Sequence, residues 1–383
     1  MMSIIFNDDI STQLSLIASE SIQWPSIQKY ETLYSRKYAE GYPGNRYYAG
    51  CKVLDKLETL AIEGGKQLFN AEHCNVQPLS GSNANLAVYF ACLKPGDTIL
   101  GMSLKAGGHL THGAKVSLTG QWFNSISYGV KNDQIDYEEV KALALKYRPK
   151  LIIAGASSYN RIINFKYFRE IADLVGAFLL CDIAHFAGLI AGKAYPNPAK
   201  YADFVTSTTH KTLRGPRGGL ILCKERYAKL IDRAVFPGIQ GGPFMHSIIG
   251  KAFMFKEDYS LYSQELIKNA RALALGINEL GFKIYGNYDG KFTDCHMFVV
   301  RVESGEDAQN LLENANILCN RNYLPGDKKP TGVRFGSTIL TALGISENKC
   351  HTLGSYIGKL LAKKINITEV QIFVKHLLDS SII

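Results

Sequence analysis

Short apolar runs alternate with amphipathic stretches along the middle of the chain. Residues 151–156 and 177–183 are nearly continuous apolar runs, which is typical of strands buried on both faces. Between them, residues 164–175 carry the apolar spacing of a helix, with Asn164 as the expected N-cap and Gly176 just past the end. This order predicts a crossover unit that joins two parallel strands.

The alternation continues over most of the first 258 residues. It predicts further helices at residues 55–69, 82–93 and 137–147 and further strands at residues 98–102 and 204–208. Gly64 and Gly65 weaken the first of these helices, because glycine is a poor helix former. We therefore expect an α/β fold with a mainly parallel sheet covered by helices on both faces, and ligands at the carboxyl ends of its strands.

The pattern changes before and after this region. From residue 259 it predicts a long helix up to residue 280, extended segments at 282–285 and 296–302, and helices at 306–314 and 346–364. We divide the chain into a large domain at residues 51–258 and a smaller α+β C-terminal domain at residues 259–383. Residues 1–50 are irregular and rich in Tyr and Gly, which we interpret as an N-terminal arm that contacts a partner subunit.

The composition is that of an ordinary globular protein. The chain has 383 residues, of which 46% are hydrophobic and 20% charged, so two packed lobes are expected and wholesale disorder is excluded. It begins without a basic segment followed by an apolar run, and its most apolar stretch, residues 177–192, is interrupted by Asp182 and His185. We expect neither a secretory signal nor a membrane-spanning segment.

Charge and cysteine usage narrow the choice of partners. The net charge of +9 could attract phosphates, folates or nucleic acid, although scattered solvated lysines are the simpler explanation. No dense basic block with interleaved aromatic residues is present, so nucleic-acid binding is not expected. The eight cysteines form no Cys-x-x-Cys pair, which argues against a zinc site and favours reduced thiols in the cytoplasm.

Lys211 lies between a predicted strand and a glycine-rich loop at residues 212–219. A lysine in such a position can form a Schiff base with an aldehyde cofactor. Taken alone, it would more simply be an ordinary loop lysine or a phosphate contact. Two other segments favour the cofactor.

The first segment is the apolar run that ends at Asp182, where an unpaired carboxylate would be costly. Pyridoxal phosphate requires a carboxylate against its ring nitrogen, because a protonated ring is the better electron sink. His185, three residues later, either braces Asp182 or is a satisfied polar residue near the core.

The second segment, residues 79–85, places Ser80, Gly81 and Ser82 at a predicted helix start. Free amides and the helix dipole favour a phosphate there, although Ser and Asn also serve as plain N-caps. Together with Lys211 and Asp182, this segment completes a coherent cofactor site.

Five blocks of sequence, in this order, resemble the serine hydroxymethyltransferases, which are pyridoxal-phosphate enzymes of fold type I. The blocks are residues 16–20 (LIASE), 37–48 (KYAEGYPGNRYY), 107–113 (GGHLTHG), 208–219 (TTHKTLRGPRGG) and 236–243 (FPGIQGGP). The resemblance runs from about residue 16 to residue 344. It implies a mainly parallel sheet of the seven-stranded type, pyridoxal 5'-phosphate as cofactor, and tetrahydrofolate as co-substrate. It also implies a homodimer with active sites at the interface.

The resemblance assigns roles at matching positions. Catalytic residues would be Lys211, Glu40, Asp182, His185 and Tyr48, and cofactor-binding residues would add Ser80, Gly81, Ser82, Ser157, Thr208, His210, Tyr38, Gly241 and Gly242. Arg334 would bind the carboxylate of the amino acid with help from Ser19, and Glu40 and Tyr48 would lie near the substrate. Gly241 and Gly242 would come from the partner subunit. No metal ion is implied.

Simpler roles remain open for several of these residues. Arg334 could be part of a surface ion pair, Glu40 could form an ion pair at an interface, and Tyr38 and Tyr48 could be aromatic packing within the arm.

The reaction that the resemblance implies is the interconversion of serine and glycine by cleavage of the Cα–Cβ bond, with transfer of one carbon to tetrahydrofolate.

The chain departs from the family at several positions. Ala106 stands where we expect the family's ring-stacking histidine, and the loop between Asn322 and Arg334 is shorter than usual, which weakens the inference of a folate pocket. Residues 337–344 lack the usual proline and arginine, and Ser21 replaces an asparagine. Two alternatives therefore stand beside the hydroxymethyltransferase. One is a folate-independent aldolase or transaldolase acting on β-hydroxy amino acids, and the other is a non-catalytic relative with a binding or regulatory role.

Overall fold

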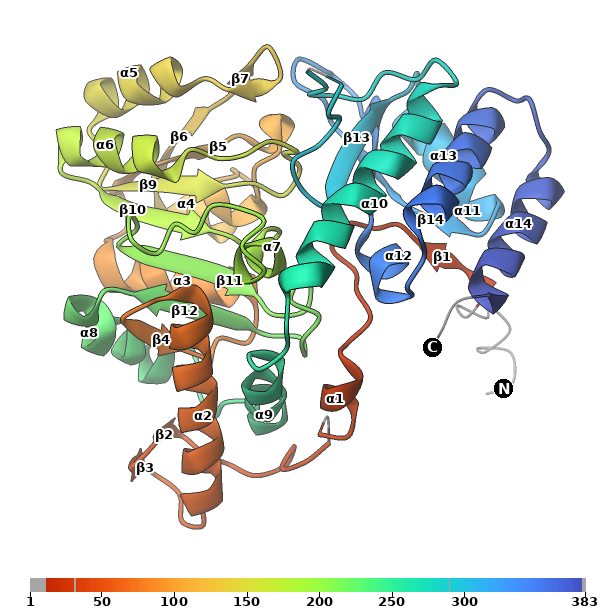
Figure 1. Cartoon of the computed structure of the whole chain (residues 1–383). Helices are drawn as coiled ribbons and strands as arrows, with labels where there is room; N and C mark the ends of the chain where they lie inside the picture. The colour runs from red at the N-terminus through yellow and green to blue at the C-terminus, as the bar shows by residue number, and fades with distance from the viewer. Residues whose placement is uncertain (1–11, 31, 289, 381–383) are drawn as a thin grey trace, which may run out of the picture. The chain divides into compact units, whose positions relative to one another are not determined.

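A sheet of seven strands in the order β4-β12-β11-β10-β9-β5-β6 forms the framework of the computed structural model, which describes residues 12–30, 32–288 and 290–380 (Figure 1). The strands are β4 (His73–Asn75), β5 (Thr98–Met102), β6 (Asn124–Tyr128), β9 (Leu151–Gly155), β10 (Phe178–Asp182), β11 (Phe204–Thr208) and β12 (Gly219–Cys223). Five strands that are adjacent in the sheet, β6, β5, β9, β10 and β11, pair in parallel. Strand β12 runs antiparallel to both of its neighbours, β11 and β4. The prediction of a mainly parallel α/β sheet is confirmed.

Helices cover the sheet, so that every residue of its inner strands β9, β11 and β12 is buried. Helix α3 (Gly81–Cys92) packs against β11 and β12, whereas α6 (Phe165–Val175) packs against β9 and β10 on the other side (Figure 1). Leu180 contributes to the cluster of buried residues beneath α3, and side chains alternate along a strand. Asp182, two residues further along β10, is therefore directed to the same face, where the strand ends.

Two predicted helices show how local sequence signals act. Helix α6 begins after Asn164, whose side chain accepts a hydrogen bond from the Tyr167 amide at 3.1 Å, and ends at Gly176 in the left-handed conformation. Helix α2 (Lys52–Phe69) runs through Gly64 and Gly65 without a break. A Cβ atom at Gly65 would lie 2.6 Å from Cys74 Sγ, so close packing requires the glycine there.

The larger of two compact units comprises Gln23–Ser157 and Ile162–Ser263. Besides the sheet, α2, α3 and α6, it contains α1 (Pro25–Gln28), β2 (Gly41–Tyr42), β3 (Asn45–Arg46), two short 3₁₀ turns (Leu104–Ala106 and Leu110–His112), α4 (Leu118–Trp122), β7 (Val130–Lys131), β8 (Gln134–Ile135), α5 (Tyr137–Tyr147), α7 (Ala187–Ala191), α8 (Ala228–Arg233) and α9 (Met245–Met254).

The smaller unit comprises Ser158–Arg161, Gln264–Ile383 and the described residues up to Ile22. Its elements are β1 (Leu14–Ser15), most of α10 (Ser260–Asn278), β13 (Met297–Arg301), α11 (Gly305–Asn314), β14 (Ile317–Leu318), β15 (Asn320–Asn322), β16 (Gly332–Gly336), α12 (Thr338–Ala342), α13 (Glu347–Leu361) and α14 (Ile367–Asp379). A three-stranded sheet, β13-β16-β15, and the parallel pair β1-β14 connect these elements.

One prediction in the smaller unit was wrong. Residues 282–285 do not form a strand, because their only ladder contact is an isolated bridge between Ile284 and Val300. The first 11 residues of the predicted arm, with the segment considered for a secretory signal, lie outside the described residues. Among the residues that are described, no helix is both long and apolar enough to cross a membrane.

The core of the smaller unit allows a test of its packing. Phe298 and Phe335 stack with ring centroids 5.7 Å apart, and both are fully buried. We expect Phe335→Ala to lower the free energy of unfolding of this unit by about 3–5 kcal/mol, because it removes buried apolar surface and leaves a cavity. Urea denaturation followed by circular dichroism measures the change. Tyr323→Ala, at a side chain that is 42% exposed, serves as control and should change it by less than about 0.5 kcal/mol.

Candidate active site

A cavity of about 180 Å³ lies at the carboxyl ends of β9, β10 and β11 in the larger unit. The residues that line it are Ser80, Gly81, Ser82, His109, His112, Ala156, Ser157, Asp182, Ala184, His185, Thr208, His210, Lys211 and Arg217. Nine of the predicted site residues are in this set, namely Ser80, Gly81, Ser82, Ser157, Asp182, His185, Thr208, His210 and Lys211. Segments far apart in sequence meet here because parallel strands end at the same edge of the sheet.

Asp182 is 8% exposed, and its carboxylate is satisfied by hydrogen bonds. Oδ2 accepts one from Asn85 Nδ2 at 2.9 Å and lies 3.0 Å from His112 Nε2, while Oδ1 accepts one from the Ala184 amide at 3.1 Å. Burial alone would raise the pKa of Asp182, but the hydrogen bonds and charge interactions, led by His112, outweigh it and hold the pKa well below its ordinary value. The carboxylate is therefore ionised at neutral pH.

Lys211 extends into the cavity from the loop that follows β11. Its Nζ lies 3.1 Å from Nε2 of His185. Thr212 anchors the loop that carries Lys211. Its hydroxyl donates to the His185 carbonyl at 3.2 Å and accepts from the Gly188 amide at 2.9 Å. The amine is thus held beside an imidazole at the wall of the cavity.

The histidine that hydrogen-bonds to Asp182 is His112, which was not among the predicted site residues. Both His109 and His112 belong to the block at residues 107–113, and this block was the signal that could have identified them. Nδ1 of His109 lies 2.8 Å from Thr111 Oγ1. The ligand-type atoms of His109, His112 and Asp182 lie within 4.8 Å of one another, but a metal ion there would have to replace the hydrogen bond between His112 and Asp182.

Two cavity histidines are neutral at physiological pH. Burial lowers the pKa of His109 to about 4, with nearby His112 and Lys211 acting in the same direction and Asp182 opposing. Burial also lowers the pKa of His210 to about 4, assisted by the charge of Arg217. A neutral imidazole offers a flat ring without a charge.

The start of α3 forms another part of the cavity wall, through Ser80, Gly81 and Ser82. Ser80 is the N-cap, with its Oγ accepting from the Asn83 amide at 3.1 Å. A Cβ atom at Gly81 would lie 2.8 Å from Thr208 Cγ2, so glycine lets the helix start pack directly against β11. The free amides of this first turn and the helix dipole form a seat for an anion, which we call the phosphate seat (Ser80–Ser82).

Five predicted residues do not line this cavity and form a separate cluster in the same unit. Tyr38 and Tyr48 have ring centroids 5.3 Å apart and are 60% and 44% exposed. A Cβ atom at Gly242 would lie 3.3 Å from the Tyr38 ring, and one at Gly241 would lie 3.7 Å from Glu40 Oε1. We call these five residues the tyrosine–glycine cluster.

Arg334 and Ser19 belong to the smaller unit. Arg334 lies on β16, is 9% exposed, and donates from Nε to Asn320 Oδ1 at 3.1 Å. Burial lowers the pKa of Arg334 to about 10, which leaves the guanidinium charged at neutral pH. The chain before Ser19 runs along the same strand, because the Gly336 amide donates to the Leu16 carbonyl at 2.7 Å.

The departures from the family have local structural outcomes. Ala106 is 5% exposed in a 3₁₀ turn and is not among the residues that line the cavity, whereas His109, three residues later, is. In the short loop after β15, Thr331 hydrogen-bonds to Asp327 and Leu324 is buried. This loop is folded, and its effect on folate stays a prediction.

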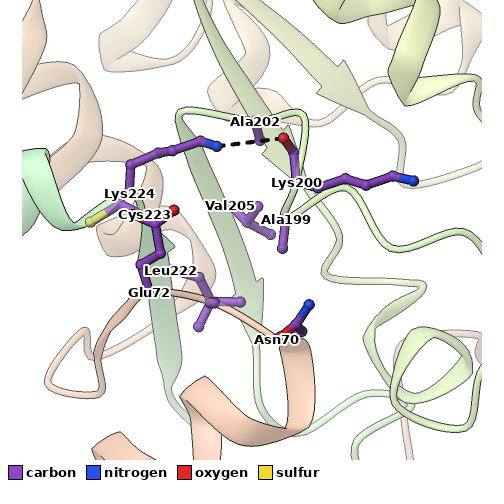
Figure 2. A pocket seen from close by; sticks show the side chains of 10 residues that line it. Asn70, Glu72, Ala199, Lys200, Ala202, Val205, Leu222, Cys223 and Lys224 are labelled. Atoms are coloured by element: carbon purple, nitrogen blue, oxygen red, sulfur yellow. Dashed lines mark hydrogen bonds between the residues drawn. The ribbon is translucent and has the colours of Figure 1, made fainter.

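A second cavity, of about 300 Å³, lies near the amino end of β11 (Figure 2). Lys224 is one of its lining residues, and its Nζ donates to the Lys200 carbonyl oxygen at 3.5 Å, the contact that Figure 2 marks with a dashed line. Nine of the predicted site residues line the first cavity and none lines this second one.

Comparison with known proteins agrees with the geometry. The sequence model of a family described as serine hydroxymethyltransferase matches residues 5–357. A serine hydroxymethyltransferase from Coprothermobacter proteolyticus is 50% identical over 374 residues, which cover 94% of this chain and 89% of the relative. Serine hydroxymethyltransferase 1 from Pseudomonas fluorescens is 48% identical over 375 residues, which cover 94% of this chain and 90% of the relative.

The two neutral histidines generate a pH prediction. Their folded pKa of about 4 is below the unfolded value of about 6.5, so between these values the unfolded chain binds more protons. We therefore expect the two histidines to leave the free energy of unfolding of the cofactor-free protein undiminished above pH 6.5. As the pH drops from 6.5 to 4, they should lower this free energy. Thermal unfolding at several pH values measures the slope. His109→Asn/His210→Asn should have a shallower slope in this window, and an unchanged slope would contradict the assignment.

Proposed function

The chain belongs to the serine hydroxymethyltransferase family, and from this premise we propose that it interconverts serine and glycine, with pyridoxal 5'-phosphate as cofactor and tetrahydrofolate as one-carbon acceptor. The observation that carries the proposal is that Lys211, Asp182 and the phosphate seat line one cavity. An imine-forming lysine, a carboxylate for the ring nitrogen and an anion seat are the groups that this cofactor requires. The names of both relatives favour this reaction over the folate-independent aldolase and the non-catalytic relative.

The residues of the cavity fit the cofactor. Lys211 would hold its aldehyde carbon, Asp182 its ring nitrogen, and the phosphate seat its phosphate. Ser157, His185, Thr208 and His210 would complete its surroundings. The chemistry that pyridoxal phosphate supplies when bound is an electron sink for the pair released as the Cα–Cβ bond breaks.

Asp182 would keep a proton on the ring nitrogen of the cofactor, which would face its carboxylate. Its carboxylate is ionised and buried, and a buried negative charge stabilises a positive charge beside it. His109 would lie against the face of the cofactor ring, because its neutral imidazole lines the cavity. On this proposal the absence of an aromatic side chain at Ala106 does not leave the ring uncovered.

Arg334 would bind the substrate carboxylate, with Ser19 assisting. A guanidinium group presents two parallel donors that match a carboxylate, and this one is buried and charged. Glu40 would exchange a proton with the serine hydroxyl, beside Tyr48. General acid–base assistance of this kind is typically worth ~10²–10⁴ in rate.

We further propose that two copies of the chain form a homodimer and that the tyrosine–glycine cluster of one copy completes the cavity of the other. In support, this cluster does not line the cavity of its own chain, and its tyrosines are exposed. Next to it in sequence, Gly238 and Ile239 line an apolar groove with exposed Phe90 and Trp122, a surface suited to association. A cytoplasmic location is also part of the proposal, and it is supported by eight unpaired cysteines.

The catalytic lysine can be tested directly. With pyridoxal phosphate and tetrahydrofolate, the purified protein should convert serine to glycine and absorb visible light. We expect Lys211→Ala to lose the visible absorbance and several orders of magnitude of activity, because no other amine is assigned to the aldehyde. Absorption spectroscopy and a glycine assay provide the measurements. Lys224→Ala, at the second cavity, should retain both. Serine cleavage that proceeds equally well without tetrahydrofolate would favour the aldolase.

The carboxylate-binding arginine can be tested by kinetics. We expect Arg334→Ala to lower kcat/KM for serine about 10- to 100-fold, because a hydrogen bond to a charged group contributes about 1.5–3 kcal/mol. Binding of the cofactor, followed by its absorbance, should persist. Arg301→Ala removes an exposed guanidinium from the neighbouring strand β13 and serves as the matched control. If both variants lose activity equally, Arg334 does not bind the substrate specifically.

A further inference from the structure

Lys251, on helix α9, is a fully buried lysine to which the reaction assigns no role. It is 1% exposed, which is rare for a lysine. Its Nζ donates hydrogen bonds to the backbone carbonyls of Val76 at 2.7 Å, Gly219 at 2.9 Å and Pro78 at 3.5 Å. The ammonium group is therefore surrounded by carbonyl oxygens rather than by water.

Two of these carbonyls belong to the segment that leads into the phosphate seat. Because the C=O of one residue and the N–H of the next point in opposite directions in a trans peptide, holding Val76 and Pro78 also orients the following amides. The amide of Gln77 donates to Asn75 Oδ1 at 3.0 Å, and the amide of Leu79 donates to Gln240 Oε1 at 3.1 Å. The backbone up to Ser80 is thus held on both sides.

The third carbonyl, that of Gly219, connects Lys251 to the phosphate seat through the start of β12. A Cβ atom at Gly219 would lie 2.3 Å from the Ser80 carbonyl oxygen, and one at Gly218 would lie 2.8 Å from Lys251 Nζ. The two glycines therefore let the lysine, the start of β12 and the seat pack in direct contact. This packing accounts for the glycine pair that ends the block at residues 208–219.

Within residues 12–30, 32–288 and 290–380, no carboxylate forms an ion pair with Lys251. The acidic group that acts on it, Glu58, is buried and already bonded to Arg46 at 2.5 Å and to Gln77 at 2.7 Å. Burial lowers the pKa of Lys251 to about 7, while Cys74 and Glu58 act in the opposite direction. A bound anion at the seat would favour the protonated, positively charged form of Lys251.

We propose that Lys251 is a positioning residue for the cofactor phosphate: its ammonium group holds the 76–80 segment and supplies positive charge behind the phosphate seat. The proposal rests on the proposed function, because it requires a phosphorylated cofactor at Ser80–Ser82. It predicts that Lys251 matters for the phosphate and not for the remainder of the cofactor.

The test compares the affinities of pyridoxal 5'-phosphate and of pyridoxal, which lacks the phosphate, for the full-length protein. Both aldehydes can react with Lys211, so visible absorbance reports both titrations. We expect Lys251→Met to weaken pyridoxal phosphate binding about 10- to 100-fold, because buried carbonyls lose their donor, while pyridoxal binding changes less than threefold. Equal losses for both ligands, or no loss for either, would overturn the proposal. If the wild-type protein binds neither ligand, the proposed function fails instead.

Two further variants keep the test decisive. In Gly218→Ala the lysine is kept, but the added methyl group would displace its Nζ, so the same selective loss is expected even if Lys251→Met does not fold. Lys256→Met removes an exposed lysine just after the same helix and should leave the ratio of the two affinities unchanged. A selective loss in Lys256→Met would show that any nearby positive charge acts alike and would contradict the assignment to Lys251.

Discussion

The site depends on the hydrogen bonds that stabilise the buried carboxylate of Asp182. An apolar strand carries it to the edge of the sheet, where it is stable only if other elements bring donors to it. Helix α3 brings Asn85, whose amide is oriented by the Thr206 hydroxyl at 2.6 Å, and the turn at Leu110–His112 brings His112. Three separate elements are thereby fixed around one charge, and the cavity takes its shape from them.

The same helix relates the two ends of the proposed cofactor site. Ser80 caps α3, and Asn85 lies just over one turn later, so one rigid element connects the phosphate seat with the partner of Asp182. Glycines at 81 and 219 allow β11 and β12 to approach this helix start closely. Lys251 then supports the segment before it.

Much of the fold follows from local patterns. Helix α6 was predicted with its N-cap and its terminal glycine because those signals lie within a few residues of it. Strands β9 and β10 were predicted because strands buried on both faces are largely apolar. The extended segment at 282–285 was predicted wrongly, because forming a strand depends on a partner and Ile284 meets Val300 at a single bridge. Helix α9 was not predicted, and eight of its ten residues are buried, Lys251 among them.

The sequence by itself predicted Lys211, Asp182 and Ser80–Ser82 as residues of one site, because each has a recognisable local setting, and the structure brings them to one cavity. Only the tertiary structure decided what surrounds them. Asp182 and His112 are 70 residues apart in sequence, and Lys251 is 175 residues from Val76. A hydrogen bond between such distant residues depends on how strands and helices pack, and no local pattern encodes that. For this reason His112 was found in the cavity wall, and Lys251 beside the 76–80 segment, only once the chain was folded.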